Sequence, residues 1–177
     1  EPTWDRACQL QSEMFAETTA LGGLEIQLCY YRGISECRSS AWMKNAASLE
    51  RAMSAVRCIG GYTQIGRVLK HAAAMAAGQR INALVFVGHC VEEDVDELSQ
   101  LAGELGIRGV PAFMFHEGGD IPAARAFRHI AHLTNGAYCP FDAGSASQLR
   151  DLLSAVAVYA AGGRRALDHF GKRRGET

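Results

Sequence analysis

The strongest constraint on the fold is the segment of residues 81–87, which is the least polar run of the chain. A near-continuous apolar run of this length, closed by Gly88, is typical of a strand that is buried on both faces of a parallel sheet. Glu92, Glu93 and Asp94 follow it, and acidic side chains suit the positive end of a helix dipole. The segment therefore predicts a strand that leads into a helix, which is the repeating unit of a parallel α/β sheet.

The same alternation continues along the rest of the chain. Strands are predicted at residues 24–31, 81–87, 110–115 and 137–141, and a short extended piece at residues 36–38. Helices are predicted at residues 3–21, 43–56, 63–77, 92–105, 122–134 and 145–161, with a short terminal helix at residues 165–170. The last strand contains Pro140, which favours an edge position. This alternation predicts a doubly wound, mostly parallel sheet, in which ligands bind beyond the carboxyl ends of the strands.

The composition indicates one globular domain. The chain has 177 residues, of which 48% are hydrophobic, and this is enough for a sizeable core. A formal net charge of −1 gives no reason to expect a nucleic acid or a membrane as partner. No apolar run reaches the roughly 18 to 20 residues that span a bilayer. The six cysteines form no CxxC pair, which favours a reducing, cytoplasmic setting over a disulfide framework.

The most specific local motif is Gly60-Gly61-Tyr62-Thr63, at the start of a predicted helix. Glycines let two backbones approach closely, and Thr63 presents a hydroxyl at the helix N-terminus. Three roles are open for Thr63: an N-cap of its own helix, part of an anion-binding turn, or a metal ligand. Neither a GxGxxG nor a GxxxxGK[ST] phosphate motif is present.

Three features follow one another in a recognisable order. They are the Gly-Gly-x-Thr-x-Ile-Gly pattern of residues 60–66, the apolar strand that ends at Val87-Gly88, and the later helix ending His132-Leu133-Thr134-Asn135-Gly136. This order resembles a von Willebrand factor type A (VWA) domain, and it is most similar to small bacterial stand-alone members of that family. The resemblance implies a three-layer, Rossmann-like, doubly wound sheet flanked by helices in residues 1–163, followed by a short helix and basic tail in residues 164–177. The family's first strand, with its Asp-x-Ser-x-Ser motif, has no match in this sequence and is expected before Glu1.

The resemblance also implies a divalent-cation site of the metal-ion-dependent adhesion type. Thr63 matches the family's second-loop threonine, and the position of the family's aspartate falls on His89. Oxygen ligands suit Mg²⁺, whereas imidazole suits softer metals such as Zn²⁺. Thr63 and His89 therefore predict a degenerate cation site, which Glu92, Glu93 or Asp94 could supplement. Mg²⁺ is expected as a cofactor only if the missing upstream motif is present.

A binding protein is favoured over an enzyme. The predicted function is a protein-interaction module whose partner contacts the loops at the carboxyl edge of the sheet, through Tyr62, Thr63, His89, Cys90 and His116. Another protein is the expected partner, and self-association is also open. One alternative is a metal-binding sensor. A second is a thiol-dependent hydrolase that uses Cys90 with His116, although the sequence has no Gly-x-Ser-x-Gly elbow.

Overall fold

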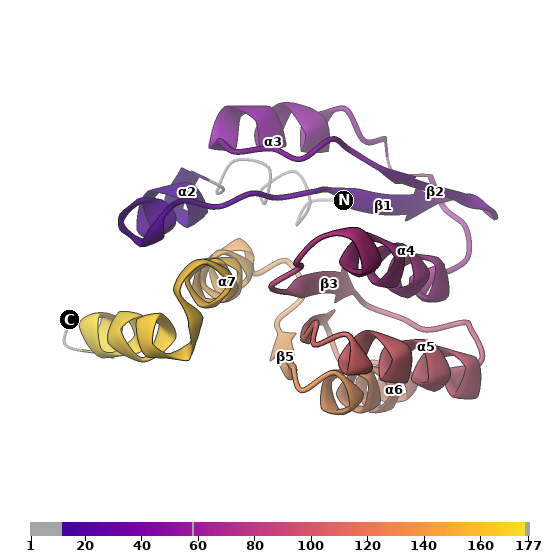
Figure 1. Cartoon of the computed structure of the whole chain (residues 1–177). Helices are drawn as coiled ribbons and strands as arrows, with labels where there is room; N and C mark the ends of the chain where they lie inside the picture. Colours follow the sequence, from indigo (N-terminus) through magenta and orange to yellow (C-terminus); the bar gives the residue numbers. More distant parts are fainter. Residues whose placement is uncertain (1–11, 58, 176–177) are drawn as a thin grey trace. The chain divides into compact units, whose positions relative to one another are not determined.

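The computed structural model describes residues 12–57 and 59–175 (Figure 1). By their contacts these residues form two compact units. The first contains the described residues of Glu1–Leu28, Ser40–Arg57 and Gly144–Thr177, and the second those of Cys29–Ser39 and Cys58–Ala143. Of the helix predicted at residues 3–21, residues 3–11 lie outside the described part of the chain, and the rest is confirmed as α2 (Ser12–Thr18) and the 3₁₀ turn η1 (Thr19–Leu21).

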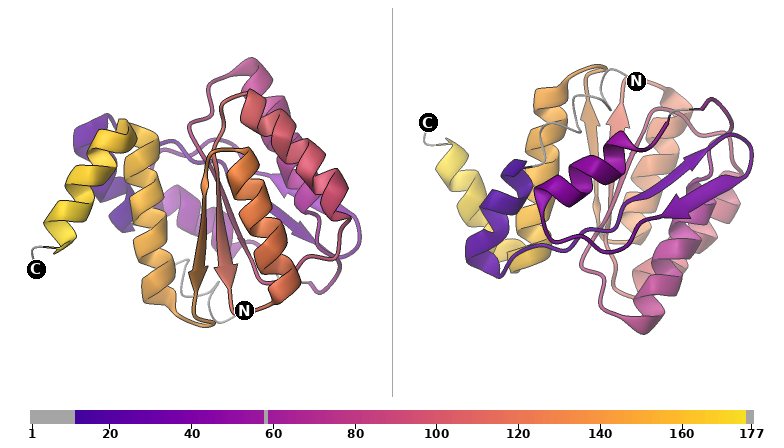
Figure 2. Two further views of the ribbon diagram at one scale, coloured as in Figure 1. Left: turned by 90° about the horizontal axis from the view of Figure 1, so that it is seen from below. Right: turned by 90° about the horizontal axis from the view of Figure 1, so that it is seen from above.

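The second unit contains a three-stranded parallel sheet flanked by helices. Its strands are β3 (Leu84–Gly88), β4 (Ala112–Glu117) and β5 (Ala137–Phe141), in the spatial order β3-β4-β5. Its helices are α4 (Ile65–Gly78), α5 (Val95–Ile107) and α6 (Ile121–Leu133). Figure 2 shows the neighbouring strands side by side and pointing the same way. This unit is therefore a mixed α/β structure, as the alternation of elements predicts.

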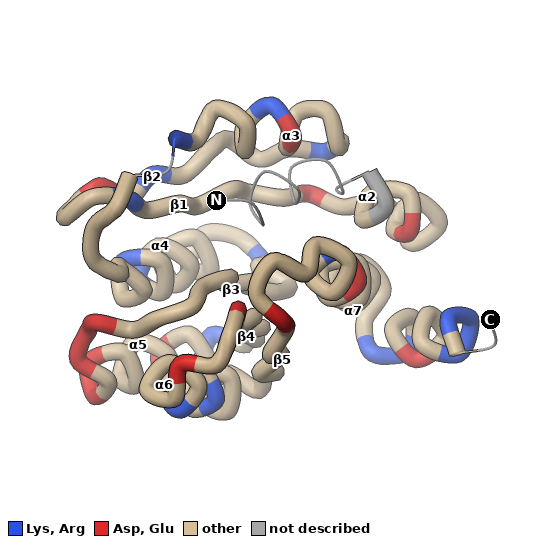
Figure 3. The backbone as a smooth tube through the Cα atoms, turned by 180° about the vertical axis from the view of Figure 1, so that it is seen from behind, with Lys and Arg blue, Asp and Glu red and all other residues tan. Residues whose placement is uncertain are grey.

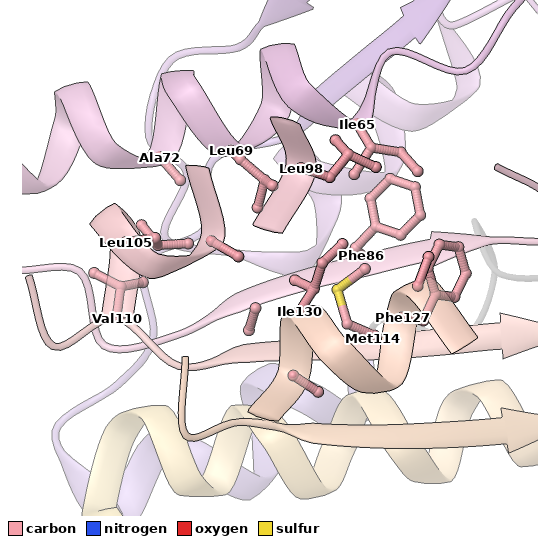
Figure 4. Packing of buried hydrophobic residues seen from close by; sticks show 14 of the residues in the cluster. Ile65, Leu69, Ala72, Phe86, Leu98, Leu105, Val110, Met114, Phe127 and Ile130 are labelled. Carbon is pink, nitrogen blue, oxygen red and sulfur yellow. The ribbon is translucent and has the colours of Figure 1, made fainter. Parts of the chain in front are cut away.

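One hydrophobic cluster joins the three helices to the sheet (Figure 4). Leu69 comes from α4, Leu98 from α5 and Phe127 from α6, and they pack with Phe86 of β3 and Met114 of β4. The Phe86 and Phe127 rings meet edge to face, with their centroids 5.4 Å apart. Each fully buried side chain of this size contributes roughly 1.5–3 kcal/mol to folding, so this cluster stabilises the unit.

The order of the strands differs from what their hydrophobicity predicts. The apolar run of residues 81–87 was expected to be buried on both faces, but β3 lies at one edge of this sheet, and Val87 is 42% exposed. The central strand is β4, where Met114, Phe115 and His116 are fully buried. In the order β3-β4-β5, each strand lies beside the strand before it in the sequence, always on the same side. A doubly wound sheet changes the direction of its strand order at one point, and this change is not present among the described strands of this sheet. The prediction of β5 as an edge strand is confirmed.

A separate two-stranded sheet begins the second unit. Strands β1 (Cys29–Arg32) and β2 (Glu36–Ser39) pair antiparallel around a turn in which Gly33 has a φ of 60°. The strand predicted at residues 24–31 is shorter than expected, because Ile26 makes only an isolated bridge with Met43. The short extended piece predicted at residues 36–38 is confirmed as β2.

The first unit is helical. It contains α2 (Ser12–Thr18), the 3₁₀ turn η1 (Thr19–Leu21), α3 (Ala46–Ser54) and α7 (Ala146–Gly175). The predicted break at Gly162-Gly163 is confirmed, because Gly163 has the non-helical angles φ 73° and ψ −169° inside α7. Arg174 beyond the break donates to Asp151 before it, over 2.7 Å. In the described part of the chain, no helix has the length and apolar character needed to cross a membrane.

Candidate functional site

The loop before α4 is held against the turn of the β1–β2 hairpin. The carbonyl of Gly33 accepts a hydrogen bond from the N–H of Tyr62 over 3.1 Å, and its own N–H donates to the carbonyl of Ile59 over 3.4 Å. A Cβ atom on Gly61 would overlap the oxygen of Gly33, whereas a Cβ atom on Gly60 would meet no atom of the described residues within 4 Å. The close backbone approach that the glycine pair predicts therefore occurs, and it requires Gly61.

Thr63 joins this loop to the loop that follows β3. Its N–H donates to the carboxylate of Glu92 over 2.9 Å, and its hydroxyl accepts the N–H of Glu92 over 3.0 Å. The prediction that Thr63 is the N-cap of its own helix is wrong, because its hydroxyl is engaged by a residue 29 positions further along the chain. The N-cap position of α4 is Gln64, whose side chain makes no capping hydrogen bond within the described part of the chain.

Glu93 takes the capping role instead. Its two carboxylate oxygens accept the N–H groups of Ile65 and Gly66, over 2.5 and 2.8 Å. These are among the first N–H groups of α4, which have no partner within the helix, and the negative charge opposes the positive end of the helix dipole. The anion at this helix N-terminus is therefore a carboxylate of the chain itself. Figure 3 shows acidic positions gathered in the loop between β3 and α5, from which Glu92 and Glu93 come.

The two loops and the hairpin turn thus form one connected structure at the carboxyl end of β3. Gln64 adds a hydrogen bond from its amide nitrogen to the carbonyl of Arg32, over 3.2 Å. Beneath the loops, the Tyr31 ring of β1 stacks on Phe86 of β3, with centroids 6.4 Å apart. Burial, followed by the neighbouring Cys90 and Glu93, raises the pKa of Tyr31, so this phenol stays neutral. We call this structure the loop clasp (residues 31–33, 59–66 and 90–93).

The side chains of the loop clasp do not fit a hard-cation site. The hydroxyl of Thr63 and both oxygens of Glu93 already accept backbone N–H groups. His89 lies exposed on the loop after β3, and imidazole is a poor ligand for Mg²⁺. Among the described residues, no group of three or more histidine, cysteine, aspartate or glutamate side chains is arranged to hold a metal.

His116 does not reach the surface on which a partner would bind. It is 0% exposed on the central strand β4, and its Nδ1 lies 2.8 Å from the hydroxyl of Tyr138 on β5. Its ring meets Phe127 nearly at a right angle, with centroids 5.4 Å apart. Among the residues that the structure describes, the Nε2 atom of His116 has no hydrogen-bond partner. His116 is thus a packed core residue in this structure, and a partner cannot touch it.

Cys90 lacks the features of an activated nucleophile. Its side chain is half-buried after β3. Burial and the nearby carboxylates of Glu92 and Asp120 raise the pKa of its thiol, whereas a catalytic thiol needs a lowered pKa. The structure thus gives no support to the alternative of a thiol-dependent hydrolase that uses Cys90 with His116.

Three exposed apolar side chains project from the loop clasp and its hairpin turn. Ile34 is 78% exposed, Tyr62 61% and Ile59 54%. Ile34 follows Gly33 in the sequence, and the backbones of Ile59 and Tyr62 are hydrogen-bonded to Gly33. We call these three residues the loop patch. Tyr62 was predicted from the sequence as a partner-binding residue, whereas Ile34 and Ile59 were not. Large apolar residues inside glycine-containing loops are the signal that could have identified them.

A shallow hollow of about 450 Å³ lies between the start of α5 and α6. It is lined by Val95, Ile121, Pro122, Arg125, Ala126 and His129. No residue of the loop patch lines it. The hollow is therefore distinct from the loop patch.

Comparison with protein-family models finds no match to this sequence, and comparison with curated proteins finds none either. The class of the protein is therefore defined by its fold. The second unit is a mixed α/β structure with a three-stranded parallel sheet flanked by helices, and its loop clasp lies at the carboxyl end of an edge strand.

Proposed function

We propose that this chain is a protein-interaction module that binds another protein through the loop patch. The observation that carries the proposal is the exposure of Ile34, Ile59 and Tyr62 on loops that are otherwise firmly held. Apolar side chains gathered on a surface are typical of interaction sites. Tyrosine is among the residues that contribute most to binding energy when a partner covers them.

The way in which the loops are held supports the proposal. Loops that become ordered only on binding reduce affinity, because their conformational entropy is lost at that moment. Here Gly33 is bonded to Ile59 and to Tyr62, and Thr63 and Glu92 bond to each other reciprocally. The loop clasp therefore presents the loop patch in one arrangement before a partner arrives.

We further propose that the fold is a relative of the VWA domain. The support is the order of its elements: an antiparallel hairpin, a Gly-Gly-x-Thr loop that opens a helix, and strands that alternate with helices. The three-layer, doubly wound arrangement and the missing first strand belong to this proposal. In such a domain Thr63 and His89 would mark a cation site that has been lost, and apolar contacts would replace the cation.

Affinity capture with three versions of the chain tests the proposed function. The wild type is compared with the double variant Ile34→Ser/Tyr62→Ser, and with Ile107→Ser as the matched control. Ile107 is 89% exposed at the end of α5 in the same unit. Ile107→Ser therefore removes an exposed apolar side chain that does not belong to the loop patch. We expect the wild type and Ile107→Ser to retain the same partner, and the double variant to lose it. Equal retention of that partner by all three proteins would reject the proposal.

A further inference from the structure

Cys29 and Cys37 lie across the β1–β2 hairpin with their sulfur atoms 3.9 Å apart. The register pairs Tyr31 with Cys37 and Cys29 with Ser39, so the two cysteines are diagonal neighbours on one face of the hairpin. Both are free thiols on half-buried side chains. Among the cysteines that the structure describes, this is the one pair whose sulfur atoms are in contact. Figure 1 shows the two strands that carry them side by side.

We propose that Cys29 and Cys37 form a redox-active dithiol, which a low-molecular-weight disulfide oxidises to a reversible cross-strand disulfide. The sulfur atoms already face each other, and they need to approach by only about 2 Å to reach the length of an S–S bond. This inference does not rest on the proposed function.

The two thiols have different roles in the exchange. Burial, and after it the neighbouring Cys37, raises the pKa of Cys29 to about 12, so this thiol stays protonated near neutral pH and is not the first to react. The thiolate of Cys37 attacks one sulfur of the small disulfide, and the other half leaves as a thiolate that takes up a proton. This step leaves a mixed disulfide on Cys37.

The second step closes the bond within the protein. The sulfur of Cys29 attacks the sulfur of Cys37, its proton passes to the departing thiolate, and the second small thiol is released. One protein dithiol and one small disulfide have then become one protein disulfide and two small thiols. The protein has lost two electrons and two protons, and the small disulfide has gained them.

The position of the pair explains why the bond would be reversible. Diagonal neighbours in an antiparallel ladder have Cα atoms roughly 7–8 Å apart, whereas most disulfides need about 5.5–6 Å. Bond formation therefore requires the hairpin to twist further, and a strained disulfide is reduced more easily than a relaxed structural one.

Oxidation with glutathione tests the proposal on the folded wild-type chain. The reduced protein is equilibrated with mixtures of oxidised and reduced glutathione, alkylated, and digested with trypsin and a glutamate-specific protease. Cleavage after Glu25, Arg32, Glu36 and Arg38 leaves each cysteine on its own short peptide. We expect a linked product of residues 26–32 and 37–38 to accumulate as oxidised glutathione increases, and to disappear when reduced glutathione is restored.

Single variants separate the two roles. Cys29→Ser is expected to trap glutathione on Cys37, and Cys37→Ser to trap at least about tenfold less on Cys29, because the buried thiol is protonated. Cys139→Ser, which removes a half-buried thiol from β5, is expected to leave the linked product unchanged, and circular dichroism checks that each variant is folded. Separate glutathione adducts on Cys29 and Cys37 in the wild type, or a link that forms only in urea, would overturn the proposal.

Discussion

Gly61 lies where two segments of the loop clasp meet closely, because a Cβ atom there would overlap the oxygen of Gly33. We expect Gly61→Ala to lower the free energy of unfolding by at least about 2 kcal/mol, since the backbone contact within the loop clasp must open. Gly60→Ala is the matched control, with nothing within 4 Å of the added atom, and its effect should stay within about 0.5 kcal/mol. Urea unfolding measures both. Equal effects of the two variants would show that the loops do not meet at Gly61.

Glu93 makes a second prediction at this scale. Its carboxylate accepts two N–H groups at the start of α4. Glu93→Gln removes the charge and one of these two hydrogen bonds, because an amide nitrogen cannot accept. We expect a loss of about 1–2 kcal/mol in the free energy of unfolding. Glu104→Gln, at an exposed position of α5, provides the comparison and should change stability little. If the two variants were equally stable, Glu93 would not be the cap of α4.

Individual residues also show what the sequence can and cannot predict. The glycine pair correctly indicated a close backbone approach. The prediction that Thr63 caps its own helix was wrong. Glu92 and Glu93, which lie 27 to 29 positions further along the chain, accept the N–H groups of Thr63 and of the start of α4. Local patterns predict a capping residue from its neighbours in sequence, and a cap supplied by a distant loop leaves no local signal.

At the scale of elements, the two halves of α7 are joined across the break at Gly163 by Arg174 and Asp151. Burial acts to raise the pKa of Asp151, but hydrogen bonds from Arg174 and Arg150 outweigh it, so the pKa lies below its usual 3.8. A folded-state pKa below the unfolded value means that the ionised carboxylate stabilises the fold above pH 3.8, and that this stability is lost as the pH falls through the folded pKa.

Asp151→Asn should therefore lower the melting temperature at pH 7, and lower it by less at pH 3. The pair is partly exposed, so the difference at neutral pH should not exceed about 0.5 kcal/mol. Thermal unfolding at both pH values measures it, with Asp168→Asn, exposed on the same helix, as the control. A destabilisation that persisted unchanged at pH 3 would show that the ion pair is not its cause.

Element types were easier to predict than element positions. The helices at α3, α5 and α6 and the strand β5 follow from periodicity, acidic helix starts and proline placement. The caps that the structure shows for α5 and α6, Asp94 and Asp120, were not predicted. The central strand was misjudged, because the most apolar run became the edge strand β3 while β4 took the centre. Strand order depends on which strands pair across the sheet, and the apolar character of a single segment does not encode that pairing.

At the scale of the whole molecule, we expect a partner to bind without a metal ion. Thr63 and Glu93 are committed to backbone N–H groups, so we expect millimolar Mg²⁺ or Mn²⁺ to leave the melting temperature unchanged. A ligand that binds only the folded state must raise it. Thermal unfolding with and without each cation is the measurement, and Ca²⁺ at the same ionic strength is the control. A rise specific to Mg²⁺ or Mn²⁺ would contradict this expectation.

The most direct test places a photo-crosslinking phenylalanine analogue at single positions of the full chain. Introduced at Tyr62 or Ile34, which are 61% and 78% exposed, it should join the chain covalently to a partner protein on illumination. Introduced at Ile107, which is 89% exposed in the same unit, it should give no such product. Crosslinking from Ile107 with none from Tyr62 or Ile34 would contradict the claim that the loop patch is the binding surface.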